Sequence, residues 1–197
     1  MSADDLPILE FPDRSAWERW LENHHESSAG VWLKIARKSS GAITVTYPEA
    51  LEEAIRCGWI DGQKGADDDG FWLQRFGPRG PRSKWSQVNR RKATELIEQG
   101  RMRPAGIAEV NRAKHDGRWD AAYAPQSTVR VPDDFQTALD ANPTANEFFA
   151  TLKSSERYSF LYRIHDAKRP DTRARRIRDY VAMLAAGETI HGRPSGD

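Results

Sequence analysis

The sequence predicts an α+β fold: a small, mainly antiparallel sheet covered by helices, followed by an all-helical C-terminal module. Two alternating, β-rich stretches, 59–64 and 71–76, flank a polar loop with glycine at both ends, which is typical of a hairpin. The last third of the chain instead carries apolar residues at helical spacing. A chain of 197 residues, 38% of them hydrophobic, is long enough to bury its own core.

The elements before the hairpin follow from local signals. Residues 1–11 are expected to form a short arm, and Asp13 is a suitable N-cap for a first amphipathic helix. Residues 30–38 alternate and predict a strand. Pro48 stands in the first turn of a second helix, and Gly58 ends that helix.

The hairpin carries polar groups between large aromatic side chains. Period-two alternation predicts that Trp59, Asp61 and Gln63 share one face of the first strand and that Lys64 lies on the other. If Asp61 is buried it needs a partner, and Arg75 on the facing strand is the candidate.

The chain after the hairpin is expected to be mostly helical. Residues 77–82 contain two prolines and two glycines and predict a basic loop, with Ser83 as the N-cap of the next helix. We expect residues 1–125 to form the α+β domain, 130–187 the helical module and 188–197 a disordered tail.

Charge is balanced over the whole chain but not along it. Thirty basic and 29 acidic residues give a net charge of +1, which indicates no global attraction to nucleic acid or membranes. Residues 75–103 hold nine cations and two carboxylates, nine minus two giving +7, and a second basic cluster spans 168–178. An arginine-rich loop before a helix can bind phosphate or carboxylate. The alternative is that these cations are solvated or paired with carboxylates.

Several site classes are not predicted. The single cysteine, Cys57, excludes an internal disulfide and fits a reducing compartment. The N-terminus lacks the features of a signal peptide, and no apolar run reaches the roughly 18 residues of a membrane span; we therefore expect a cytoplasmic protein. No histidine spacing, phosphate loop or nucleophile elbow indicates a metal, a cofactor or a catalytic centre.

Six short motifs occur in a characteristic order: GWIDGQ at 58–63, RF followed by PR at 75–79, SKWSQVN at 83–89, GRMRPAG at 100–106, DGRW at 116–119 and AKRPDTRARRI at 167–177. Together they resemble the YdeI/OmpD-associated, or bacteriocin-protection, family of bacterial proteins, over roughly residues 10–187. The resemblance implies a helical C-terminal module and a link to bacteriocin or cell-envelope stress tolerance. It implies no catalytic residues.

These observations predict a non-enzymatic binding protein whose partner is a small anionic ligand or a protein. The predicted ligand surface consists of Trp59, Asp61, Gln63, Arg75, Arg79, Lys84, Trp85 and Asn89. Two alternatives stay open. One is nucleic-acid or nucleotide binding through residues 75–103, and the other is an enzyme that acts on a small anionic substrate with Asp61 in its site.

Overall fold

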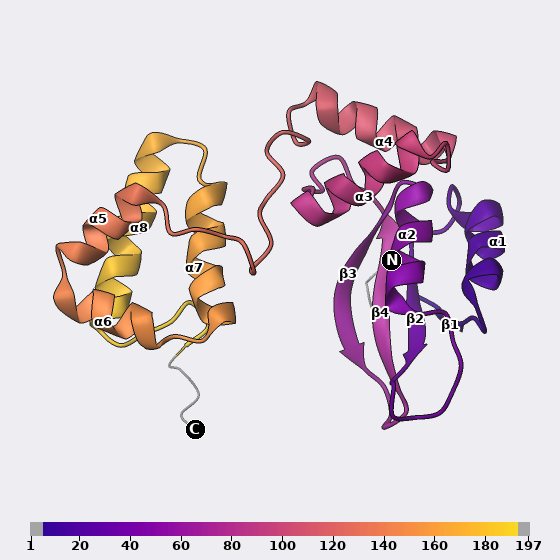
Figure 1. The fold of residues 1–197 in the computed structure, drawn as a ribbon, viewed down its shortest axis with the longest axis horizontal. Helices are drawn as coiled ribbons and strands as arrows, with labels where there is room; N and C mark the ends of the chain where they lie inside the picture. The colour runs from indigo at the N-terminus through magenta and orange to yellow at the C-terminus, as the bar shows by residue number, and fades with distance from the viewer. Residues whose placement is uncertain (1–5, 193–197) are drawn as a thin grey trace. The chain divides into compact units, whose positions relative to one another are not determined.

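The computed structural model describes residues 6–192, which form two compact units, each with its own hydrophobic core (Figure 1). The first unit ends at Ala122 and the second begins at Tyr123. The first unit combines a sheet with helices and the second is helical, so the predicted α+β class is confirmed.

A four-stranded sheet organises the first unit, with the strands in the order β1-β2-β4-β3. Its elements are β1 (Ile8–Glu10), α1 (Arg14–His24), β2 (Val31–Ala36), α2 (Tyr47–Arg56), β3 (Trp59–Ala66), β4 (Phe71–Pro78), α3 (Gln87–Glu98) and α4 (Pro104–His115). Strand β1 pairs with β2 in parallel, and the other two pairings are antiparallel. The segment expected to be a simple arm therefore contributes an edge strand.

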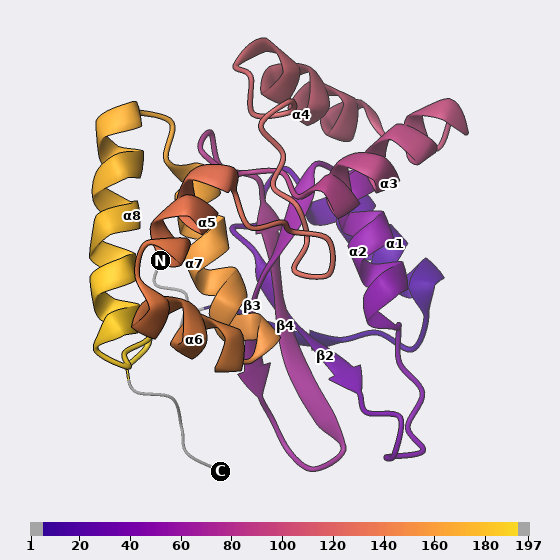
Figure 2. The same ribbon diagram turned by 60° about the vertical axis from the view of Figure 1, so that its left-hand side comes forward.

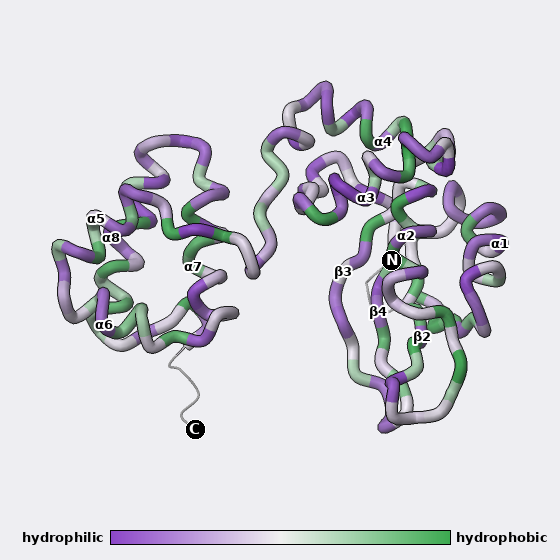
Figure 3. Tube along the Cα trace, in the orientation of Figure 1, coloured by the Kyte–Doolittle hydropathy of each residue, from purple (hydrophilic) through white to green (hydrophobic). Residues whose placement is uncertain are grey.

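Helices α1 and α2 cover one face of this sheet (Figures 1 and 2). The apolar side chains of β2 on that face, Val31, Leu33 and Ile35, join Trp17 of α1 and Leu51 of α2 in one buried cluster. Each helix carries hydrophobic residues on one side and hydrophilic residues on the other (Figure 3), as expected for elements that pack on one face.

A β-bulge in β3 changes which of its side chains share a face, so the predicted placement of Lys64 opposite to Asp61 is wrong. Asp61 pairs with Phe76 and Lys64 pairs with Gln74, so three steps on β3 oppose two on β4. Lys64 therefore lies on the same face as Asp61, where its Nζ is 4.8 Å from the centre of the Trp72 ring. The buried amide of Gln74 donates hydrogen bonds to the carbonyl oxygens of the bulge, which explains why a glutamine is tolerated at 1% exposure.

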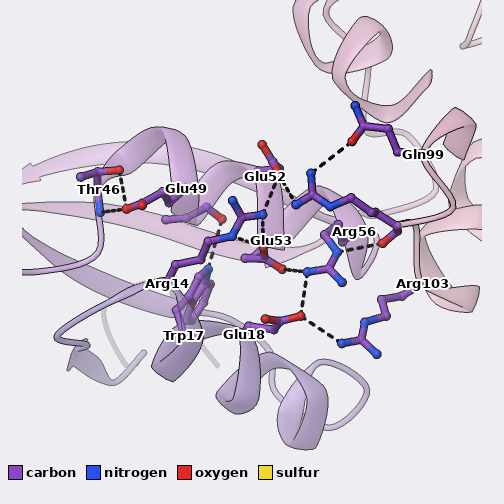
Figure 4. Close-up of polar contacts among 12 residues, drawn as sticks. Arg14, Trp17, Glu18, Thr46, Glu49, Glu52, Glu53, Arg56, Gln99 and Arg103 are labelled. Atoms are coloured by element: carbon purple, nitrogen blue, oxygen red, sulfur yellow. Dashed lines mark hydrogen bonds and ion pairs between the residues drawn. The ribbon is translucent and has the colours of Figure 1, made fainter. Parts of the chain in front are cut away.

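A charge network ties α1, α2 and the α3–α4 connection together (Figure 4). Its centre is the Glu53 carboxylate on α2, which is 1% exposed and accepts hydrogen bonds from Arg14 and Arg56. Arg56 also donates to Glu18 on α1 at 2.7 Å, and Glu18 accepts from Arg103 at 3.1 Å. A buried carboxylate needs such partners, because an unpaired buried charge is costly.

Up to residue 192, the second unit contains four helices around its own core. They are α5 (Asp133–Asp140), α6 (Pro143–Thr151), α7 (Ser154–Asp166) and α8 (Pro170–Ala185). Residues 188–192, expected in a disordered tail, form a turn in which Thr189 is 6% exposed and bonds Gly192; residues 193–197 lie outside the described part. Within residues 6–192 no helix is long and apolar enough to cross a membrane.

The charge network predicts loss of stability in acid. Burial opposes the ionisation of Glu18 and Glu52, but their arginine partners outweigh it and hold both pKa values below the ordinary value of 4.5. A lowered carboxyl pKa contributes stability above the ordinary pKa, and this contribution is lost as pH falls through the folded-state pKa. The melting temperature should therefore decrease as the pH is lowered below about 4.5.

Thermal unfolding followed by circular dichroism between pH 7 and pH 3 measures this loss. Glu18→Gln should reduce the decrease in melting temperature between pH 7 and pH 3. Glu26→Gln, at a carboxylate that is 85% exposed, should leave that decrease unchanged. The account would be contradicted if the melting temperature decreased equally with falling pH in Glu18→Gln and in the unmodified protein.

Candidate functional site

The eight residues of the predicted ligand surface lie in different places on the first unit. Trp59 belongs to the core: it is 1% exposed, its indole N–H donates to the His25 carbonyl at 3.0 Å, and it packs edge-on against Trp17. Gln63 lies exposed in the bulge of β3. Neither residue joins the others in one cluster.

Asp61 and Arg75 do not form the expected ion pair. Asp61 lies opposite Phe76, so the neighbouring Arg75 points to the other face of the sheet. The Asp61 carboxylate instead accepts a hydrogen bond of 2.8 Å from the Tyr47 hydroxyl of α2. The side chain of Arg75 lies alongside Gly62, where a Cβ would stand 3.6 Å from Arg75 Cβ and Cδ, an ordinary contact distance.

The remaining predicted residues gather where β4 leads into α3. The sequence placed the N-cap at Ser83, but the helix begins three residues later, and the Ser86 hydroxyl accepts from the Asn89 N–H at 3.0 Å. Ser83 is used in the preceding loop, where its hydroxyl accepts from the Gly80 N–H. Trp85 therefore precedes the helix and belongs to the hydrophobic core of the first unit. Lys84 beside it is exposed.

We name Arg79, Trp85 and Asn89 the α3-entry cluster. All three are buried, at 5%, 1% and 8% exposure. The guanidinium carbon of Arg79 lies 3.6 Å from the centre of the Trp85 ring, a close cation–π contact, and its Nη1 donates to the Lys84 carbonyl at 3.3 Å. The cluster thus places a cation against the start of a helix, where the backbone dipole is also positive.

The Trp85 indole N–H is buried and has no hydrogen-bond partner among residues 6–192. Asn89 beside it is 8% exposed, and its backbone N–H already bonds Ser86. A buried donor without an acceptor costs about 1–3 kcal/mol, so such groups in folded proteins usually meet water or a ligand. The cluster therefore offers a hydrogen-bond donor to an acceptor that the protein chain does not supply.

Four further residues, Arg90, Asp116, Arg118 and Trp119, support the cluster, and none of them was among the predicted ligand-binding residues. Trp119 meets the Trp85 ring edge-on at 4.9 Å, and its carbonyl accepts from Arg90 at 3.1 Å. Arg118 donates to the Ser83 carbonyl at 2.7 Å and pairs with Asp116, which fixes the loop from the other side. The sequence signal that could have indicated them is the DGRW motif at 116–119, which places a carboxylate, a cation and an aromatic residue close together.

The predicted basic segment does not form one continuous cationic stripe. Arg91, Arg101 and Arg103 pair with Glu95, Glu52 and Glu22. The acidic hairpin loop pairs with Lys34 of β2 instead, at 3.1 Å to Asp67. Several of these cations are therefore paired with carboxylates, which was the alternative to anion binding that the sequence left open.

Two other kinds of chemistry find no support in the described residues. The Cys57 thiol is buried, and burial raises its pKa to about 11, so it is a poor nucleophile at neutral pH. Within residues 6–192 no group of three or more His, Cys, Asp or Glu side chains is arranged to hold a metal ion.

Two protein families match different parts of the chain. Residues 128–187 match the family described as bacteriocin-protection, YdeI or OmpD-associated. This match lies within the second unit. Residues 9–109, just over half of the chain, match a family described as a domain of unknown function (DUF8412), so the chain belongs to the DUF8412 family. No curated protein and no solved structure matches the chain.

The motifs suggested one family over residues 10–187, whereas two families match different parts of this range. The YdeI/OmpD-associated family covers the second unit, including the arginine-rich motif at 167–177. The motifs at 58–63 and 83–89, and with them the α3-entry cluster, fall within the DUF8412 domain.

A matched pair of substitutions tests the unpartnered donor. Trp59 and Trp85 are each 1% exposed, but the Trp59 N–H is hydrogen-bonded and the Trp85 N–H is not. Replacement by phenylalanine leaves a similar gap at both sites, so Trp59→Phe should cost about 1 kcal/mol more in unfolding free energy than Trp85→Phe. Urea unfolding measures the difference, and a greater cost for Trp85→Phe would show that its N–H is already bonded.

Proposed function

We propose that the protein is a non-enzymatic binding protein that captures a small anionic ligand at the α3-entry cluster. The observation that carries this proposal is the buried, unpartnered indole N–H of Trp85 beside the Arg79 guanidinium. A carboxylate or phosphate oxygen satisfies that donor and meets a positive charge at the same time. The first turn of α3 adds its dipole to the attraction.

The same residues favour binding over catalysis. A reaction needs a nucleophile or an acid–base group in contact with the substrate. The cluster itself supplies an indole, an amide and a guanidinium, of which the guanidinium is permanently charged and the other two do not titrate near neutral pH. The alternative enzyme with Asp61 as its centre is less favoured, because that carboxylate is engaged by Tyr47 and lies on the strand rather than in the cluster.

Nucleic-acid binding through residues 75–103 is also less favoured. It requires cations that are free to meet successive phosphates. Arg91, Arg101 and Arg103 are paired with glutamates, and Arg79 is 5% exposed. A single buried anion site suits a small ligand better than a polyanion.

The cellular role that we propose is tolerance to bacteriocins or envelope stress, exerted from the cytoplasm. The family description of residues 128–187 supports the bacteriocin link. The single buried cysteine fits a reducing compartment. If the role depends on the ligand, cells that carry Trp85→Phe should lose bacteriocin tolerance, and cells that carry Trp59→Phe should keep it.

Ligand binding is tested with sodium acetate and inorganic phosphate. Each should raise the melting temperature of the intact protein, and saturation at a hundred times the dissociation constant corresponds to about 2.7 kcal/mol of added stability. Trp85→Phe and Asn89→Leu should weaken this response, because each removes a donor. Equal concentrations of sodium chloride serve as the ionic-strength control.

The matched control is Trp59→Phe, which alters a buried tryptophan outside the cluster. It should respond to acetate and phosphate like the unmodified protein. The proposal is overturned if neither anion stabilises the protein beyond sodium chloride, or if Trp85→Phe responds as strongly as Trp59→Phe.

A further inference from the structure

The arginine-rich segment where α7 leads into α8 has no part in the proposed ligand site. Residues 163–178 hold seven cations and two carboxylates, a net charge of +5. The other residues between 123 and 192 hold three cations and seven carboxylates, a net charge of −4. The second unit is therefore nearly neutral as a whole but concentrates its positive charge in one short segment.

Hydrogen bonds between the two helices bring these cations to one place. The Arg173 guanidinium donates to the Ile164 carbonyl at 2.8 Å, and the Arg176 guanidinium donates to the Arg163 carbonyl. The last turn of α7 is therefore held against the first turns of α8, next to the connection that joins them (Figure 1).

Most of these cations have no carboxylate partner. Arg173 pairs with Asp134 at 2.6 Å. Among residues 6–192 no ion pair involves the other six cations, which we name the α8 patch: Arg163, Lys168, Arg169, Arg175, Arg176 and Arg178. Arg176 is half-buried and the other five are exposed. The patch thus carries positive charge that the described chain does not pair.

We infer that the α8 patch binds the phosphate backbone of a double-stranded nucleic acid without reading its base sequence. A DNA duplex carries one negative charge per about 1.7 Å of its axis, so closely spaced cations can each meet a phosphate. Five of the six cations are arginines, whose guanidinium forks match phosphate oxygens. Arg175 and Arg178 lie three residues apart on α8 and are therefore neighbours on its surface.

The uncharged side chains favour a duplex over other anionic partners. Among residues 123–192 no Phe, Tyr or Trp side chain is exposed, and the exposed large hydrophobic residues of the described chain all lie in the first unit. Single strands are bound largely by stacking on aromatic rings. Membrane-surface helices insert an apolar face, and protein interfaces have an apolar core. The patch offers charge alone, which suits a duplex backbone.

Fluorescence anisotropy of short labelled duplexes of DNA and of RNA measures binding to the intact protein. If four patch cations meet phosphates, the affinity should fall about a hundredfold between about 50 and 200 mM salt, because each contact releases counterions. Duplexes of unrelated base sequence should bind equally, and single strands should bind more weakly. Binding of either duplex with this salt dependence supports the inference, and the comparison shows which nucleic acid is preferred.

A matched pair of double variants locates the binding surface. Arg175→Gln/Arg178→Gln should weaken duplex binding at low salt at least about tenfold and lower the steepness of the salt dependence, since two phosphate contacts are lost. Arg37→Gln/Lys38→Gln removes the same charge from two exposed positions of the first unit and should bind like the unmodified protein. Unchanged melting temperatures verify that both variants fold.

Three results would overturn the inference. The first is that neither duplex binds at low salt. The second is that single strands, or vesicles that contain phosphatidylserine, bind more tightly than the duplexes. The third is that the two double variants lose duplex affinity equally, which would assign the binding to total charge rather than to the α8 patch.

Discussion

The turn at Gly58 is the constraint on which the rest of the first unit depends. Its φ of 76° ends α2 and starts β3 in a conformation that other residues rarely adopt. The missing Cβ lets α4 approach closely, and the carbonyl fixes the end of β4 through Arg79. The end of α2, the start of β3, the end of β4 and α4 therefore meet at one residue that has no side chain.

The charge network around Glu53 and the α3-entry cluster use arginine in opposite ways. In the network, Arg14 and Arg56 meet carboxylates of the same unit, so their charge is balanced internally and holds helices together. In the cluster, the Arg79 guanidinium stacks on an aromatic ring beside a donor that lacks an acceptor. The first arrangement is complete without a ligand, whereas the second has hydrogen-bonding capacity left over.

Local signals predicted much of the fold and the part of the candidate site that lies close together in sequence. Asp13 caps α1 and Gly58 ends α2 as expected, because caps and glycine turns depend on a few neighbouring residues. The bulge that moves Lys64 to the other face was missed, since register depends on the partner strand. Trp119 was not predicted as part of the site, because it meets Trp85 through tertiary packing that no spacing encodes.

The central claim is that the buried Trp85 N–H lacks an acceptor until a ligand supplies one. The most direct test is to follow the proton resonance of each indole N–H by nuclear magnetic resonance during titration with acetate and with inorganic phosphate. The account predicts that the Trp85 resonance moves downfield and saturates, while the Trp59 resonance, already hydrogen-bonded to His25, stays in place. A Trp85 resonance that does not respond to either ligand would contradict the account.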